Sequence, residues 1–144
     1  MVLGAKNNPD CRGEPVYLDH IAIWTTDLER LKSFYESYFD VQCGSLYFNP
    51  NRQFSSYFLS FEQGARLELM SIPELDASSR ANIVRTGYAH LAIAVASKEK
   101  VDAITARLEK DGYDIVGAPR LTGDGYYESV VLDPDGNMIE ITAG

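Results

Sequence analysis

The sequence predicts an α+β protein made of two tandem βαβββ modules. One apolar strand pattern, LDHIAIW at 18–24, recurs 70 residues later as YAHLAIAV at 88–95. A second pair of strands shares the patterns RLELM at 66–70 and MIEIT at 138–142. A glutamate follows the histidine by 48 residues in the first half (20 to 68) and by 50 in the second (90 to 140). Because the same strand patterns recur in the same order, we interpret the chain as two copies of one structural module.

Length and composition narrow the class of protein. A chain of 144 residues fits one compact domain, and a net charge of −8 argues against a nucleic-acid partner. There is no long apolar run and no basic-then-apolar leader, so we expect no membrane span, no signal peptide and a cytoplasmic location. Cys11 and Cys43 form no disulfide framework and no thiolate zinc motif. Residues 1–16 lack periodicity and predict a disordered tail.

The first module is predicted over about residues 17–71, beginning with a strand at 17–24. Thr26 and Glu29 have the spacing of a helix capping box, so a helix should follow. Its apolar stripe recurs at helical spacing: Leu28, Leu31, Phe34 or Tyr35, and Tyr38. Turn-forming residues then separate three predicted strands: 41–48, 54–61 and 65–71.

The second module repeats this order over about residues 88–143, after a polar linker at 72–87. Its first strand spans 88–95, and Ser97 should cap a helix with an apolar stripe at Val101, Ile104 and Leu108. Asp111-Gly112 predicts the end of that helix. Three strands complete the module: 114–119, 126–132 and 137–142, with a turn at 133–136. The two modules together form a single domain over 17–143.

The alternation of side chains along a strand predicts where the repeated polar residues lie. Ile21 and Ile23 point to one face, whereas His20 points to the other with Ala22 and Trp24. The glutamate strands and the second module follow the same rule. The branched apolar residues can therefore cover the helices, which leaves each histidine and glutamate on the reverse face. Small and mixed side chains on that face suit the wall of a cavity.

Four polar residues at equivalent positions predict a metal site: His20, Glu68, His90 and Glu140. Two imidazoles and two carboxylates suit one divalent ion such as Zn, Ni, Fe, Co or Mn. The alternative is that each histidine is a hydrogen-bonded core residue and each glutamate is solvated. Because these are the only two histidines and both occupy the same place in the repeat, we favour the metal site.

Other residues could line a substrate pocket on the same face. Arg66 lies two residues before Glu68 and could bind an anionic group, although a surface salt bridge is the alternative. Trp24, Met70 and either Tyr126 or Tyr127 could line the pocket, and ordinary packing is the alternative for each. Asp19 should point to the opposite face, so we do not count it as a ligand.

The four predicted ligands and the terminal DPDGNMIEI at 133–141 resemble the vicinal oxygen chelate superfamily, which comprises glyoxalase I, bleomycin resistance proteins and extradiol dioxygenases. The resemblance covers about residues 17–143. It implies βαβββ modules whose curled mixed sheets surround a metal-binding cleft, with the first and fourth strands of each module adjacent. It also implies a homodimer, in which modules pair either within one chain or across two chains.

The His/Glu/His/Glu order is similar to that of glyoxalase I, which implies a lactoylglutathione-lyase-like metalloenzyme with lyase or isomerase chemistry. By this resemblance Glu140 or Glu68 removes a proton beside a metal-bound oxygen of a small carbonyl substrate, and the metal holds the enediolate. Bacterial glyoxalase I typically has arginine four residues after the first histidine and asparagine four after the first glutamate. Here these positions are Trp24 and Ile72, which argues against glutathione dependence.

Two alternatives use the same resemblance. An Fe(II) extradiol-type dioxygenase would need only three of the four ligands, and the fourth carboxylate would occupy the position that O₂ requires. A non-enzymatic, bleomycin-resistance-like protein that binds a cationic drug would suit the acidic composition but would not need the four ligands. Each of the three hypotheses predicts a small-molecule partner.

Overall fold

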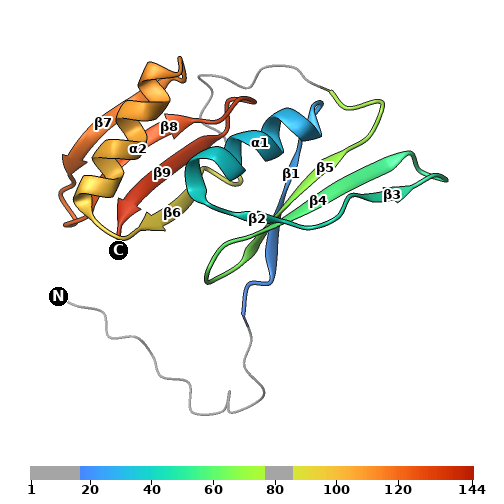
Figure 1. The fold of residues 1–144 in the computed structure, drawn as a ribbon, viewed down its shortest axis with the longest axis horizontal. Coiled ribbons are helices and arrows are strands. Elements are labelled where there is room, and N and C mark those ends of the chain that lie inside the picture. Colours follow the sequence, from blue (N-terminus) through green and yellow to red (C-terminus); the bar gives the residue numbers. More distant parts are fainter. Residues whose placement is uncertain (1–16, 77–85) are drawn as a thin grey trace, which may run out of the picture.

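The computed structural model describes residues 17–76 and 86–144 and confirms the α+β fold with two βαβββ modules (Figure 1). The predicted tail at 1–16 and most of the predicted linker lie outside the described residues. The first module contains β1 (His20–Trp24), α1 (Leu28–Phe39), β2 (Gln42–Cys43), β3 (Tyr47–Asn49), β4 (Phe54–Ser60) and β5 (Arg66–Ser71). The second contains β6 (Leu91–Val95), α2 (Lys98–Lys110), β7 (Ile115–Leu121), β8 (Tyr127–Leu132) and β9 (Met138–Ala143).

Each module forms its own sheet with the same strand order. The first sheet runs β1-β5-β4-β2, with β3 also paired to β4, and the second runs β6-β9-β8-β7. The first and last strands of each module are parallel neighbours, and the remaining pairs are antiparallel. The first strand of each module, which begins at or just after the histidine, is therefore an edge strand. It lies directly beside the strand that carries the glutamate.

The helix boundaries follow local capping, with one correction to the predicted cap. The expectation that Thr26 caps α1 is wrong, because the side chain of Asp27 accepts the hydrogen bond from the Arg30 backbone N–H (2.9 Å). Ser97 caps α2 as predicted, accepting from the Lys100 N–H at 3.2 Å. The helix ends at Lys110, and Gly112 follows with a φ of +90°, which a glycine adopts without strain.

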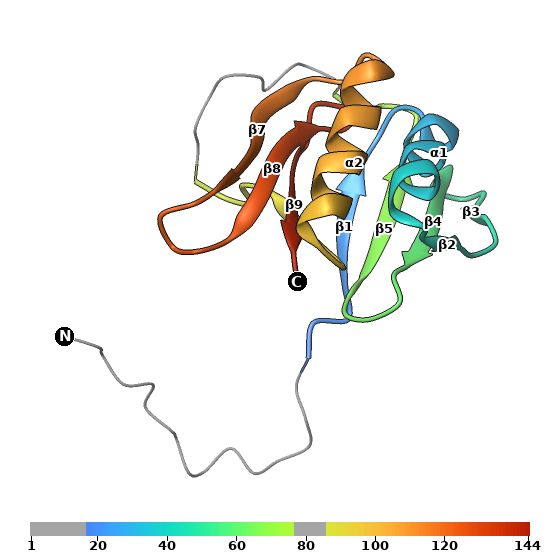
Figure 2. The same cartoon turned by 60° about the vertical axis from the view of Figure 1, so that its left-hand side comes forward.

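One apolar core runs through both modules, and each helix covers the apolar face of its sheet (Figure 2). Leu31 and Phe34 of α1 are buried with Leu67 and Leu69 of β5. The corresponding residues of the second module belong to the same cluster: Val101, Leu108, Ile139 and Ile141. Because the core is continuous, the modules are held together at their helix-covered faces.

Helix α1 makes the polar contacts between the modules, and it lies in the middle of the molecule in Figure 1. The Tyr35 hydroxyl donates to Asp133 at 3.1 Å, and the Tyr38 hydroxyl donates to Asp111 at 2.5 Å. Arg30 forms an ion pair of 2.5 Å with Asp135. The predicted turn after β8 thus packs on α1 of the other module.

None of the helices among the described residues is both long and apolar enough to cross a bilayer.

Candidate metal centre

The first His–Glu pair lies on the face of its sheet that the helices leave uncovered. Burial alternates along β1, with His20, Ala22 and Trp24 exposed between two partly buried isoleucines. The parallel register pairs His20 with Arg66 and places Ala22, two residues further along β1 on the same face, opposite Glu68. His20 Nε2 consequently lies 3.6 Å from Glu68 Oε2. This distance exceeds the hydrogen-bonding range, so the two groups face each other without sharing a proton.

The second module builds an equivalent pair. His90 directly precedes β6, and Ala92 of that strand lies opposite Glu140 of β9. His90 Nε2 is 3.2 Å from Glu140 Oε2. Both pairs thus consist of one imidazole nitrogen and one carboxylate oxygen, placed by the same parallel register. We call them the first half-site (His20, Glu68) and the second half-site (His90, Glu140).

The two half-sites remain separate within the chain. Among residues 17–76 and 86–144, no three His, Cys, Asp or Glu side chains gather closely enough to hold a metal ion. The half-sites lie on different sheets, and the modules are joined through α1 and the helix-covered faces. The chain therefore carries the four predicted ligands as two pairs.

The donor chemistry of the half-sites fits a divalent ion that prefers nitrogen and oxygen ligands. Each half-site offers only two donors, whereas the protein ligands of a zinc-type site number three or four. Two half-sites together would supply four. The residues present are therefore suitable for such an ion only where a first half-site and a second half-site meet.

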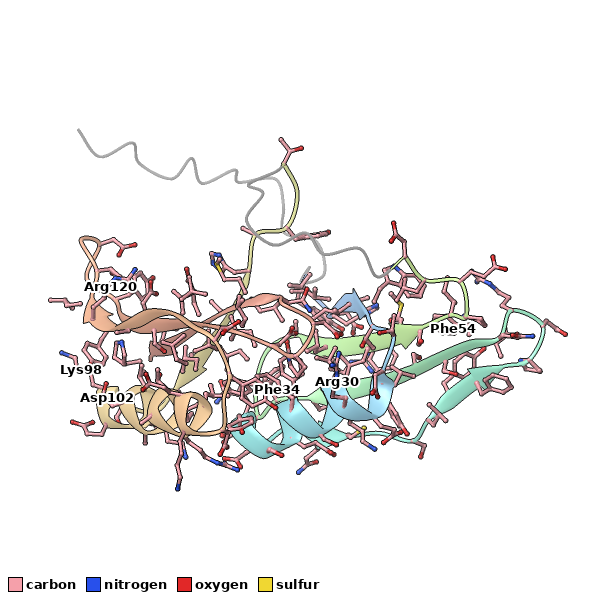
Figure 3. The ribbon with its side chains drawn as sticks, turned by 90° about the horizontal axis from the view of Figure 1, so that it is seen from above. Arg30, Phe34, Phe54, Lys98, Asp102 and Arg120 are labelled. Carbon is pink, nitrogen blue, oxygen red and sulfur yellow. The ribbon has the colours of Figure 1, made fainter. Side chains whose placement is uncertain are left out.

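Apolar side chains extend the uncovered face beside the first half-site. Trp24 lies opposite Met70 in the register of β1 and β5, and Met70 lies opposite Ser56. Trp24 is 45% exposed, and its ring meets that of Phe54 edge-on with the ring centres 6.2 Å apart. Phe54, labelled in Figure 3, lies 6.1 Å from the ring of Tyr47. We call Trp24, Phe54 and Tyr47 the aromatic wall.

Phe54 and Tyr47 were not predicted from the sequence, although a signal for them was available. Side chains alternate along a strand, and directly paired residues share a face. Tyr47 pairs with Ser56, and Phe54 lies two residues from Ser56 on the same strand. Once β4 was placed beside β5, this pattern would have located both rings on the face of Glu68.

Arg66 shares the face of Glu68 but is engaged by other protein groups. Its guanidinium donates to Asp19 at 2.6 Å and lies 4.3 Å from the ring centre of Phe58. Asp19 also contacts Nδ1 of His20 at 2.7 Å. The hydrogen bond with His20, and then that with Arg66, lower the pKa of the Asp19 carboxyl. In the structure Arg66 therefore forms a salt bridge, which was the alternative to binding an anionic group of a substrate.

Tyr127 lies on the opposite face, toward helix α2. Its hydroxyl donates to Asp102 at 2.6 Å, and Lys98 lies 5.4 Å from its ring centre (Figure 3). The hydrogen bond with Asp102 raises the pKa of Tyr127. The structure therefore does not bring Tyr127 to the half-sites, whereas its neighbour Tyr126 is 55% exposed.

Comparison with known proteins identifies relatives of the whole described fold. The chain is 27% identical to an uncharacterised protein, YqjT of Bacillus subtilis, over 129 residues that cover 88% of this chain and 98% of YqjT. Glyoxalase I from Zea mays superposes with a TM-score of 0.71 at 22% identity, covering 88% of this chain. The match spans only 44% of the maize protein, so this chain corresponds to less than half of it.

A lactoylglutathione lyase from Agrobacterium tumefaciens superposes with a TM-score of 0.64 at 22% identity, over 92% of this chain and 96% of that protein. At this level of identity, the structural matches show a shared fold and leave the activity of this chain open. The family model of the Glyoxalase/Bleomycin resistance protein/Dioxygenase superfamily matches residues 17–141. The chain therefore belongs to the Glyoxalase/Bleomycin resistance protein/Dioxygenase superfamily.

Proposed function

We propose that the protein is a glyoxalase-I-like, divalent-metal-dependent enzyme with lyase or isomerase chemistry on a small carbonyl substrate. The recurrence of the His–Glu pair carries this proposal. Two modules place an imidazole nitrogen 3.6 Å and 3.2 Å from a carboxylate oxygen through the same strand register. A structural role in packing would not require the same pair on the uncovered face of both sheets.

A complete site would form between two copies of the chain. The first half-site of one copy would meet the second half-site of its partner, and a two-fold axis would generate two identical sites. Each half-site adjoins an edge strand of its sheet, β1 or β6, which permits this approach. Exposed apolar side chains near the half-sites also support a covering partner, because Trp24, Tyr47 and Met138 are all at least one-third exposed.

In such a site, His20, Glu68, His90 and Glu140 would hold the ion. When bound, the ion would supply a Lewis acid that makes a carbon-bound hydrogen beside a carbonyl more acidic. Glu140 is the better candidate for the base, since its side chain is 24% exposed against 13% for Glu68. Its Oε2 would accept the proton and return it to the neighbouring carbon.

The surroundings of the first half-site favour a substrate with an apolar group. The aromatic wall and Met70 offer apolar contact on that side. Arg66 is already paired with Asp19. Trp24 occupies the position where bacterial glyoxalase I typically has the arginine that would bind a carboxylate of the substrate. These contacts support a substrate other than the glutathione hemithioacetal.

The test combines metal content with turnover. Protein purified without chelator should contain about one divalent ion per chain, since two half-sites make one site. His20→Ala and His90→Ala should each lose it, whereas the Asp102→Asn control on α2 should keep it. Glu140→Gln should abolish turnover of an identified carbonyl substrate because an amide cannot act as the base. Absence of metal, before and after titration with Zn, Ni, Co, Mn and Fe(II), would contradict the proposal.

The aromatic wall and the net charge of −8 favour a second candidate, a non-enzymatic protein that binds a cationic aromatic compound. This candidate predicts tight binding of such a compound that persists in the presence of a chelator and in His90→Ala. The metalloenzyme predicts that chelator and His90→Ala both abolish substrate binding. An Fe(II) dioxygenase would instead consume oxygen in the presence of a catechol.

A further inference from the structure

We infer that Asp19, held in place by Arg66, is a positioning residue that fixes His20 with its hydrogen on Nδ1 and its Nε2 lone pair toward Glu68. The inference rests on the proposed function only where it identifies Nε2 as a metal donor. Asp19 Oδ2 lies 2.7 Å from His20 Nδ1 and 2.6 Å from a guanidinium nitrogen of Arg66. The carboxylate thus bridges the imidazole and the guanidinium.

Backbone and ring contacts hold this arrangement in place. The backbone N–H of Arg66 donates to the Asp19 carbonyl at 2.9 Å, so the two residues are joined through main chain and side chain. The Arg66 guanidinium lies 4.3 Å from the ring centre of Phe58. The His20 ring meets the same Phe58 ring nearly at right angles, at 5.3 Å. His20 and Arg66 therefore share one aromatic support.

The hydrogen-bonding capacities of these groups determine the tautomer. An ionised carboxylate only accepts hydrogen bonds and a guanidinium only donates, so Asp19 can contact Nδ1 only if that nitrogen carries hydrogen. Nε2 lies 3.6 Å from Glu68, which is beyond hydrogen-bonding distance. In the neutral ring the lone pair then belongs to Nε2 and faces the Glu68 carboxylate. Carboxylates commonly orient metal-binding histidines in this way.

The second module provides a natural comparison because it lacks both supporting residues. Ala89 precedes His90, at the position that Asp19 has before His20. Met138 is the counterpart of Arg66, and Thr142 is the counterpart of Met70. Ala89 has no hydrogen-bonding side chain, and the thioether of Met138 donates no hydrogen bond and accepts only weakly, so neither can replace a carboxylate or a guanidinium. We therefore expect the first half-site to be fixed before an ion binds and the second to be less constrained.

The test uses variants that convert the first half-site into the pattern of the second: Asp19→Ala, Arg66→Met and both together. Imidazole ¹⁵N shifts of His20 and His90 would be measured without metal at about pH 8.5, where an ordinary imidazole is neutral. We expect His20 to be the Nδ1–H tautomer in the unmodified protein. It should shift toward a mixture in Asp19→Ala, while His90 remains unchanged. An Nε2–H or doubly protonated His20 in the unmodified protein would overturn the inference.

Zinc affinity provides the second readout. Loss of an outer hydrogen-bonding partner typically weakens metal binding by about 10–100-fold, and we expect this effect for Asp19→Ala. Asp102→Ala removes an exposed carboxylate elsewhere and should leave the affinity unchanged. Equal zinc affinities of Asp19→Ala and the unmodified protein would overturn the inference. If the unmodified protein bound none of Zn, Ni, Co, Mn and Fe(II), the proposed function would fail, and the tautomer of His20 would still decide the inference.

Discussion

Asp133, in the turn after β8, contacts helix α1 of the other module through its hydrogen bond with Tyr35. Its side chain is 4% exposed and accepts hydrogen bonds from the Tyr35 hydroxyl, the Asn137 side-chain amide and the backbone N–H groups of Asp135 and Asn137. Asp133→Ala leaves these donors without an acceptor, so the free energy of unfolding should fall by about 3 kcal/mol. Urea unfolding would measure the change. Asp102→Ala, at an exposed carboxylate, is the control, and equal losses in both variants would contradict the assignment.

The ionisation of Tyr38 should make the free energy of unfolding depend on pH in alkaline solution. Burial, followed by its hydrogen bond to Asp111, raises the pKa of Tyr38 to about 12. Between the ordinary tyrosine pKa of about 10 and this value, the unfolded chain loses a proton that the folded protein keeps. The stabilisation is therefore complete below pH 10 and is lost as the pH rises toward 12. Urea unfolding at several pH values should show a shallower decline for Tyr38→Phe, and an unchanged decline would contradict this cause.

The sequence predicts correctly the face of the sheet on which a side chain lies where the alternation along a strand alone determines that face. Alternation places His20 and Glu68 on one face, and the structure has them there. It fails for Asp19, which precedes β1 and turns its carboxylate back to the neighbouring imidazole, a contact outside the strand pattern. For Tyr127 the pattern left two adjacent tyrosines as alternatives. The hydrogen bond to Asp102 settles on which face Tyr127 lies, and that partner is distant in sequence.

At the scale of elements, α1 belongs structurally to both modules. Phe34 is buried in the common core, and its ring lies 5.0 Å from that of Tyr113, just after α2. Phe34→Ala should lower the free energy of unfolding by about 3–5 kcal/mol, because it removes a large ring from a packed core. Val116→Ala on an exposed strand position should change it by no more than about 0.5 kcal/mol. Both variants should unfold in one transition, and separate transitions for the modules would contradict a common core.

The order of elements is predictable because each has a strong local pattern, whereas their boundaries depend on tertiary pairing. The strand predicted at 41–48 is divided into β2 and β3, which pair with different parts of β4. The cap of α1 lies one residue later than predicted, because Asp27 takes that role while Thr25 accepts from the Asp27 N–H. Both Thr26 and Asp27 are good capping residues, so composition alone did not distinguish them.

At the scale of the whole molecule, the sequence left open how the two half-sites are combined. The repeat predicts two equivalent modules, but pairing within one chain and pairing across two chains use the same residues. The structure joins the modules through α1, with contacts such as Tyr35 to Asp133, and leaves the half-sites on separate sheets. That arrangement depends on many weak contacts between modules, which no short sequence pattern encodes.

The proposed metal site, shared between two copies of the chain, makes a specific prediction for mixed variants. His20→Ala destroys only the first half-site, and Glu140→Ala destroys only the second, so each variant alone should lose tight zinc binding. In a mixed dimer, the intact first half-site of the Glu140→Ala copy meets the intact second half-site of its His20→Ala partner. After subunit exchange in an equal mixture, half of the dimers carry one complete site, which restores about a quarter of the original zinc capacity.

Equilibrium titration with zinc would measure this recovery. The control is a mixture of His20→Ala with Glu68→Ala. Both of these variants lack the first half-site, so this mixture should recover no zinc capacity. No recovery in the first mixture, despite demonstrated exchange, would mean that each site forms within a single chain.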